Sequence, residues 1–149
     1  RRSLKPALDG LCADLIADGR IEAGAAACTG GAIPVGGRVR SIGRLGKVPV
    51  ILAGDAAGLA NPITGAGIAA AVQSGRLAGL AAAAWLKGDG EALADYDDEL
   101  GELFDASLGR ARGHRLALMQ AYRESGQLSR TALRRSWIAY PDYWATGER

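Results

Sequence analysis

The first third of the chain contains one helical pattern followed by a stretch with no long period. Apolar residues recur at three- and four-residue spacing from Leu4 to Ile16, which predicts an amphipathic helix ending at Gly19. Small residues, β-branched residues and glycines mix from Arg20 to Arg44, a composition typical of short strands and turns. The apolar run from Val48 to Ala53 then predicts a short buried strand.

Helical patterns dominate the rest of the chain. An alanine-rich helix is predicted from about Gly67 to Leu86, closed by the turn Lys87–Gly90. A second amphipathic helix is predicted from Glu91, and helical spacing continues as far as Tyr122. Its apolar positions are Leu93, Tyr96, Leu100, Leu103, Phe104, Leu108, Leu116 and Met119. Ser129 is a typical helix cap, and it predicts a final helix that carries Leu133, Trp137 and Ile138.

Composition and charge exclude several classes of protein. The chain has 149 residues, of which 48% are hydrophobic, enough for a globular core. Eighteen Lys and Arg against 16 Asp and Glu give a net charge of +2, too balanced to predict nucleic acid as a partner. Cys12 and Cys28 lie far apart without a nearby histidine, so neither a metal site nor a disulfide framework is predicted. A reducing, cytoplasmic compartment fits this cysteine usage best.

Charged residues are segregated along the second half of the chain. The segment Asp89–Asp105 is acidic and Arg110–Arg135 is basic, which we interpret as two solvated helix faces that attract one another, with a binding surface as the alternative. His114 lies in the basic run and is interpreted as a solvated helix residue rather than a ligand or base. The most apolar window, Ile68–Leu86, is interrupted by Gln73, Ser74 and Arg76, and a central arginine argues against a membrane span.

The stretch VILAGDAAGLANPITGAG, Val50–Gly67, is longer than a chain reversal requires. Gly54 removes a Cβ where the strand ends, and Asp55 places a carboxylate acceptor at that edge. Further on, Pro62 stiffens the loop, and Gly65 and Gly67 allow free N–H groups to point outward at the positive end of the following helix. The stretch therefore predicts a site for a ligand with hydroxyl groups and a developing negative charge.

Reduced flavin has both properties: its ribityl chain would lie beside Asp55, and its N1/C2=O edge near Gly67 and Ile68. The alternative is an aspartate that only caps a turn in an α/β protein. Gly-Asp alone does not decide between them. The full spacing G-D-A-A-G-x-x-x-P-x-x-G-x-G-I before an alanine-rich helix favours flavin.

The segment GDAAGLANPITGAGIAAAVQSGRLAG resembles the second FAD-binding motif of the flavoprotein group that includes p-hydroxybenzoate hydroxylase, and within it the geranylgeranyl reductase family. Two features point to the reductase branch. Gly58 stands where the aromatic hydroxylases commonly carry histidine. Upstream, GGAIPVGG at Gly30–Gly37 is similar to that family's G-G-x-I-P stretch. The resemblance is strong from Gly30 to Gly79 and only architectural beyond.

The resemblance implies a fold of the α/β class, an FAD-binding Rossmann-like flavoprotein, of which this chain would be an α+β fragment. The fragment would hold one or two strands and the Gly-Asp motif, followed by a C-terminal helical segment. Asp55 would bind the ribityl hydroxyls, and the residues that shape the flavin edge would be Pro62, Gly65, Ala66, Gly67 and Ile68. The cofactor's backbone side would be lined by Gly54, Ala56 and Ala57.

Two departures from the family pattern matter. Family members often read T-G-E-G-I, whereas here Ala66 replaces the glutamate, so no acidic side chain is expected at that place beside the flavin. In addition, no G-x-G-x-x-G strand-turn-helix for the FAD pyrophosphate is found in the sequence. We therefore expect the C-terminal part of a flavoenzyme, inactive alone. Residues 1–47 would end the substrate domain and return into the FAD domain, 48–88 would form the FAD-binding segment, and 89–149 the C-terminal helices.

The activity that the resemblance implies is reduction of C=C bonds in an isoprenoid or other lipid substrate, with NADPH or ferredoxin as electron donor. The nearest alternative is a flavin monooxygenase or a halogenase-like relative. No residue is identified as the catalytic proton donor, and the oligomeric state is not determined by the sequence.

A rival interpretation is a non-catalytic lipid- or membrane-docking module in peripheral contact with a membrane. The tail SRTALRRSWIAYPDYW combines arginines with aromatic residues that suit a bilayer interface. Its residues of these kinds are Arg130, Arg134, Arg135, Trp137, Tyr140, Tyr143 and Trp144. The simpler interpretation is that these aromatics pack the last helix onto the core.

Overall fold

The computed structural model describes residues 5–24 and 31–145, and its chain divides into two units, Arg1–Ala32 and Ile33–Arg149. The first unit contains α1 (Lys5–Ala17), which has no buried residue. Gly19 ends this helix as predicted: it has a φ of +68°, and the amide of Arg20 donates to the carbonyl of Leu15 at 2.9 Å. Leu4, Cys28 and Gly30 lie outside the described residues.

The second unit begins with a two-stranded antiparallel hairpin, β1 (Ile42–Leu45) and β2 (Val48–Ile51), in which Ile42 pairs with Ile51. The predicted strand Val48–Ala53 therefore ends two residues early. The reason is Gly54, whose φ of +53° turns the chain into the short 3₁₀ helix η1 (Gly54–Ala57). The strand is also not buried as predicted, because Val48 and Val50 are exposed. The expected α+β arrangement with one or two strands is confirmed.

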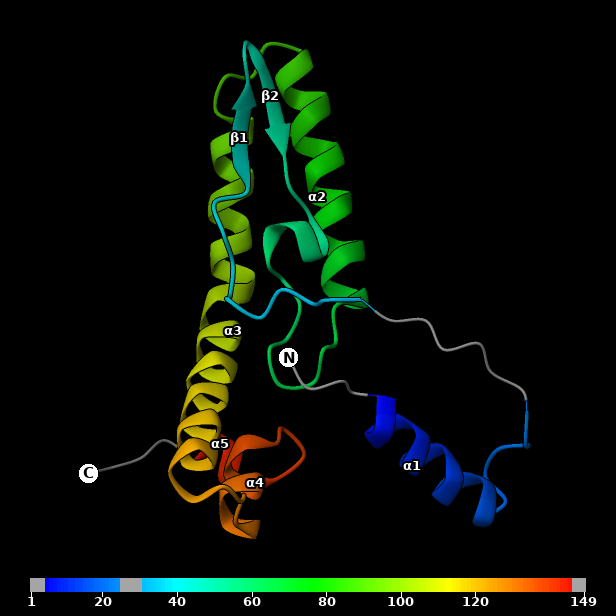
Figure 1. The fold of residues 1–149 in the computed structure, drawn as a ribbon. Helices are drawn as coiled ribbons and strands as arrows, with labels where there is room; N and C mark the ends of the chain where they lie inside the picture. The colour runs from blue at the N-terminus through cyan, green and yellow to red at the C-terminus, as the bar shows by residue number, and fades with distance from the viewer. Residues whose placement is uncertain (1–4, 25–30, 146–149) are drawn as a thin grey trace. The chain divides into compact units, whose positions relative to one another are not determined.

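Two long helices cover the hairpin (Figure 1): α2 (Ile68–Leu86) and α3 (Ala92–Ser125) lie side by side and run in opposite directions. The helix start predicted at Gly67 is confirmed, because Gly67 is the N-cap of α2. The helical spacing predicted from Glu91 to Tyr122 is one continuous helix. The core lies between these elements and consists of Ala57, Leu59, Leu77, Ala81, Leu93, Tyr96, Leu100 and Leu108.

The chain ends in two short helices, α4 (Arg130–Ser136) and α5 (Pro141–Trp144). The predicted cap is confirmed, since the Ser129 hydroxyl accepts a hydrogen bond from the amide of Ala132 at 3.1 Å. The prediction that this helix carries Trp137 and Ile138 is wrong. Trp137 has an extended backbone, and the proline at the start of α5 begins a new helix instead.

Arg38 ties the segment that precedes the hairpin to the middle of α3. Its guanidinium donates to both carboxylate oxygens of Asp105, at 2.8 and 3.0 Å, and to Asp97 at 3.0 Å. It lies across Gly101, where an added Cβ would stand 3.1 Å from its Nη2 atom. The amide of Ser41 also donates to Asp97, at 2.7 Å. One arginine thus bridges two aspartates that lie eight residues apart on one helix face.

The interpretation of the charged segments as two faces that attract one another is therefore wrong. Asp97 and Asp105 pair with Arg38, which precedes both segments. The acidic residues of α3 and its basic residues from Arg110 to Arg123 lie on one continuous helix, which keeps them apart along its axis. The other arginines of the basic segment belong to α4: Arg130, Arg134 and Arg135.

Gly58 is where the same upstream segment meets the Gly-Asp loop. Gly58 has a φ of +74°, and a Cβ added there would stand 2.3 Å from the carbonyl oxygen of Gly37. The amide of Val39 donates to the carbonyl of Ala57 at 3.1 Å, which holds the two backbones together. Backbone packing therefore accounts for a glycine at position 58, independently of any reaction.

The pairing of Arg38 with Asp105 should make stability depend on pH. Hydrogen bonding to Arg38 lowers the pKa of Asp105 from its ordinary value of 3.8. The pKa of Asp105 is therefore lower in the folded protein than in the unfolded one. The pair stabilises the protein fully above the unfolded pKa, and this contribution is lost as the pH falls through the folded pKa. Asp105→Asn should lower the free energy of unfolding by about 0.5 to 1 kcal/mol at pH 7, since the carboxylate is half exposed.

Urea unfolding between pH 7 and pH 3 measures this effect. The difference between the wild type and Asp105→Asn should shrink as the pH approaches 3. Asp98→Asn is the control, because Asp98 is exposed on the same helix and has no ion-pair partner among the described residues. A difference that stays constant over this pH range would contradict the prediction.

Gly58→Ala should destabilise the protein by at least about 2 kcal/mol. The left-handed conformation alone costs an alanine about 1 to 2 kcal/mol, and the new Cβ would overlap the Gly37 carbonyl. Gly79→Ala is the matched control, because a Cβ on this residue of α2 meets nothing within 4 Å. It should stabilise by about 0.4 to 1 kcal/mol. Equal effects of the two substitutions in urea unfolding would show that Gly58 is not constrained.

Candidate functional site

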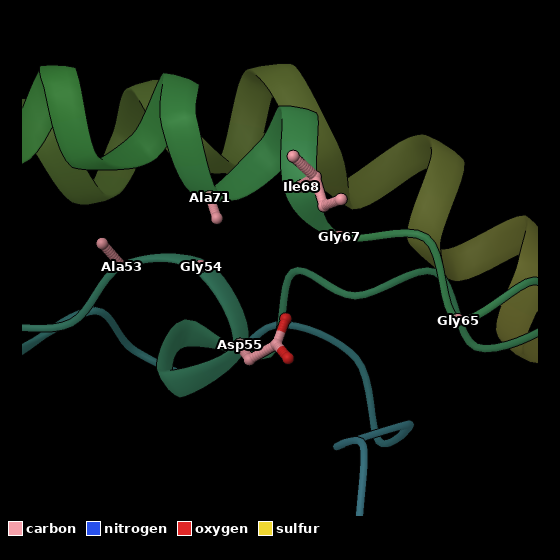
Figure 2. A pocket seen from close by; sticks show the side chains of 7 residues that line it. All are labelled: Ala53, Gly54, Asp55, Gly65, Gly67, Ile68 and Ala71. Atoms are coloured by element: carbon pink, nitrogen blue, oxygen red, sulfur yellow. The ribbon is translucent and has the colours of Figure 1, made fainter. Parts of the chain in front are cut away.

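A pocket with a volume of about 440 Å³ lies between η1 and the first turn of α2 (Figure 2). It is lined by Ala53, Gly54, Asp55, Gly65, Gly67, Ile68 and Ala71. Glycines at three of these seven positions leave backbone at the surface of the pocket. A ligand could therefore approach the peptide groups closely.

Asp55 supplies the carboxylate of this pocket. It belongs to η1 and is exposed, and its side chain has no hydrogen-bond or ion-pair partner within the described part of the chain. Figure 2 shows the carboxylate pointing into the space between η1 and the start of α2. A Cβ added to Gly67 would stand 2.8 Å from its Oδ1 atom. The carboxylate is thus next to the beginning of α2 and available to a hydrogen-bond donor.

The N-terminus of α2 forms the opposite side of the pocket. No side chain caps Gly67 there, and the amide of Ala71 donates to the Gly67 carbonyl at 2.8 Å in the first helical hydrogen bond. The N–H groups that precede Ala71 have no acceptor within the helix, and they carry the positive end of its dipole. Ile68 is the first helical residue, and its side chain is 85% exposed. This end of the pocket favours an acceptor or a negative charge.

One buried polar side chain, Ser74, holds the backbone of Gly54 beside the pocket. The amide of Gly54 donates to the Ser74 hydroxyl at 2.9 Å, and that hydroxyl donates to the carbonyl of Ala70 at 2.6 Å. Figure 2 shows Ala71 pointing from α2 toward Gly54, where a Cβ would approach the Ala71 Cβ to 2.9 Å. Ser74 was not predicted from the sequence. Its signal is a hydroxyl nearly two helical turns after the start of an alanine-rich helix.

Tyr96 supports the strand that leads into the pocket. Its hydroxyl donates to the carbonyl of Leu52 at 2.8 Å, and the ring is almost completely buried. Burial raises the pKa of Tyr96, so the hydroxyl stays protonated and remains a donor at neutral pH. The sequence predicted Tyr96 only as a core position.

Asn61 shapes the loop between η1 and α2. Its side-chain oxygen accepts hydrogen bonds from the amides of Ile63 and Thr64, at 2.9 and 3.0 Å. Its backbone amide donates to the carbonyl of Ala66 at 2.8 Å, and its carbonyl accepts from Gly65 at 2.9 Å. These bonds close residues 61–66 into a compact turn. Asn61 was also not predicted, although Asn-Pro is a known turn signal.

The structure brings together five of the nine residues predicted to bind the cofactor: Gly54, Asp55, Gly65, Gly67 and Ile68. The other four lie elsewhere. Ala56 is exposed on η1, and Ala57 is fully buried in the core. Pro62 is buried, with its carbonyl accepting a hydrogen bond from Arg115 at 2.9 Å. Ala66 lines a neighbouring hollow of about 360 Å³ that also includes Gly67.

The C-terminal aromatic residues have different surroundings. Tyr143 is buried, and Trp144 donates from Nε1 to the carbonyl of Ile138 at 3.0 Å. Trp137 remains about half exposed. The interpretation of His114 as a solvated residue is wrong, because its Nε2 atom lies 3.1 Å from the Tyr143 carbonyl oxygen and the two rings are in contact. None of the described helices is long and apolar enough to cross a membrane.

Comparison with known proteins relates part of the chain to a reductase. No protein-family profile and no solved structure matches it. The chain is similar to the digeranylgeranylglycerophospholipid reductase of Methanocella arvoryzae, with 40% identity over 83 residues. The matched segment is 54% of this chain and 20% of that relative, so the chain spans about a fifth of the relative's length. The similarity supports a relation to geranylgeranyl reductases.

Proposed function

We propose that this chain forms the flavin side of the FAD site in an oxidoreductase that reduces C=C bonds of isoprenoid chains. One observation carries the proposal: an unpartnered carboxylate, Asp55, and the uncapped N-terminus of α2 at Gly67 border the same pocket. The relation to a reductase whose name specifies geranylgeranyl chains on a glycerophospholipid supports the substrate class. The complete protein's substrate and electron donor, NADPH or ferredoxin, belong to the proposal as well.

The residues of the pocket fit a flavin in two ways. The carboxylate of Asp55 would accept hydrogen bonds from ribityl hydroxyls, and it is free to do so. The N–H groups at Gly67 and Ile68 would face the N1/C2=O edge, where a helix N-terminus stabilises negative charge by about 0.3 to 2 kcal/mol. FAD bound in this way, once reduced by the electron donor, would supply the hydride for reduction of a double bond.

The residues outside the pocket take indirect roles in this proposal. Ala57, the last residue of η1, packs in the core, and Pro62 fixes the loop that carries Gly65. Ala56 and Ala66 are small and exposed, so they would leave room for the cofactor rather than bind it through a side chain. The proton donor for the reaction is not among these nine residues, because Asp55 alone among them can titrate and its carboxylate is assigned to the ribityl chain.

A flavin monooxygenase would use the same pocket. The sequence argument against it was the glycine at position 58, and that glycine is explained by its contact with Gly37. The similarity to a reductase is therefore the observation that favours reduction over oxygenation. Product analysis with an isoprenoid lipid under anaerobic conditions would separate the two, since only the oxygenase needs O₂.

Asp55→Ala in the full-length protein should weaken FAD binding by roughly ten- to a hundredfold. The substitution removes charge-assisted hydrogen bonds worth about 1.5 to 3 kcal/mol. Excess FAD should restore much of the turnover, because the residue positions the cofactor and transfers no proton. Flavin content and turnover at saturating FAD are measured together. Asp98→Ala, an exposed aspartate far along the sequence on α3, is the control and should change neither.

Full flavin occupancy with lost turnover would contradict this role of Asp55 and indicate a catalytic acid instead. No saturable binding of FAD to the wild-type protein would refute the proposed function itself.

Gly67→Ala tests the close approach of the helix N-terminus to Asp55. The new Cβ would stand 2.8 Å from Asp55 Oδ1, so the carboxylate has to rotate away from its position. FAD affinity should fall by about tenfold while stability to unfolding changes less, because the φ of −144° at Gly67 lies outside the left-handed region that favours glycine. Gly75→Ala on α2, where a Cβ meets nothing within 4 Å, should leave affinity unchanged.

A double-mutant cycle sharpens this test. Once Asp55 is alanine, the added methyl group at position 67 no longer displaces a carboxylate, so the two effects on affinity should be less than additive. Strict additivity would show that the two residues act independently and that the contact between them does not shape the site.

A further inference from the structure

Arg115 connects the loop of the candidate site to a distant part of α3. Its Nη1 atom donates to the carbonyl of Pro62 at 2.9 Å, although 53 residues separate the two in sequence. Pro62 is one of the most completely buried side chains, and a proline has no N–H, so the carbonyl is its only polar backbone group. A buried carbonyl needs a hydrogen-bond partner. Arg115 supplies a charged one.

The remaining hydrogen bonds of this loop are internal. Asn61 bonds to Ile63, Thr64, Gly65 and Ala66, and the amide of Ala66 donates to the hydroxyl of Thr64 at 3.2 Å. In the described part of the chain, Arg115 is the one side chain from another element that hydrogen-bonds to residues 61–66. The internal bonds therefore fix the shape of the loop, and Arg115 fixes its position relative to the helices.

We propose that Arg115 is a positioning residue of the candidate site: it anchors the loop 61–66 so that Gly65 and Gly67 stay opposite Asp55. Those three residues line one pocket: Gly65 belongs to the loop, and Gly67 is the N-cap of α2, two residues after Gly65. Releasing the Pro62 carbonyl would let the loop take up several positions. A ligand that requires one particular loop position would then bind only the fraction of molecules whose loop is in that position. The part of this inference that concerns FAD rests on the proposed function.

Hydrogen exchange tests the anchoring without any cofactor. In Arg115→Met, the amides of residues 63–66, which are hydrogen-bonded within the loop, should exchange about tenfold faster than in the wild type, while amides in the middle of α2 and α3 keep their protection. Arg115→Lys retains a charged donor and should restore most of the protection. The control is Arg123→Met, an exposed arginine further along α3 without an ion pair among the described residues, and it should have no effect.

FAD titration of the full-length variants then tests the consequence for the site. The dissociation constant should rise about tenfold in Arg115→Met, recover in Arg115→Lys and remain unchanged in Arg123→Met. Unchanged exchange in a folded Arg115→Met protein would overturn the proposal, and so would faster exchange with unchanged FAD affinity. Loss of protection throughout α2 and α3 would also overturn it, because Arg115 would then stabilise the whole fold.

The two proposals can fail separately. If the wild-type protein binds no FAD, the proposed function is wrong, and the exchange measurement alone decides whether Arg115 positions the loop. If FAD binds equally to the wild type and Arg115→Met, the proposed function is supported and the positioning role of Arg115 is refuted.

Discussion

The attachment of Arg38 to Asp97 and Asp105 is the interaction on which the arrangement of the second unit depends. Its side chain is only 18% exposed, and it makes three charge-assisted hydrogen bonds to two carboxylates. Hydrogen bonding to Asp105 also raises the pKa of Arg38, so the cation persists at any physiological pH. Because the Asp105 carboxylate remains half exposed, its pair with Arg38 contributes about as much as an exposed ion pair, and the attachment acts mainly by fixing the position of the segment.

The effect of this attachment reaches the pocket through backbone contacts. Arg38 holds the segment 37–41 along α3, and the amide of Leu52 donates to the carbonyl of Ser41 at 2.8 Å at the end of the hairpin. The next residues lead directly into η1, whose first amide, that of Gly54, is held by Ser74. The position of Asp55 therefore follows from two anchors, one on α3 and one on α2.

Local patterns in the sequence predicted local features of this structure. The periodicity of apolar residues and the residue types at helix ends placed the start of α2 at Gly67 and the cap at Ser129. Both features depend only on neighbours within a few residues. The strand end and the break after Ser136 were missed. Both depend on where a backbone turns, at Gly54 and before Pro141, and hydrophobicity alone does not determine this.

The contacts that assemble the site were harder to predict. Arg38 meets its aspartates across 59 and 67 residues, and Arg115 meets Pro62 across 53, so no spacing rule connects them. Ser74 looked like a polar interruption of an apolar helix, whereas it is fully buried and binds a backbone amide. The sequence indicated which loop carries the candidate site, and the fold determined which of its residues line the pocket.

The charges around the pocket restrict the kind of ligand that it can hold. Asp55 accepts hydrogen bonds, whereas the first N–H groups of α2 donate them, and no side chain of the described residues caps that helix end. Water can satisfy both while the pocket is open. A ligand that replaces the water needs donors beside Asp55 and an acceptor beside Gly67. A phosphate group would suit the helix end but would be repelled by the carboxylate next to it. A polyhydroxyl chain joined to a ring with a carbonyl edge meets both demands, and this charge pattern is the physical basis for preferring a flavin to a phosphate at this end of α2.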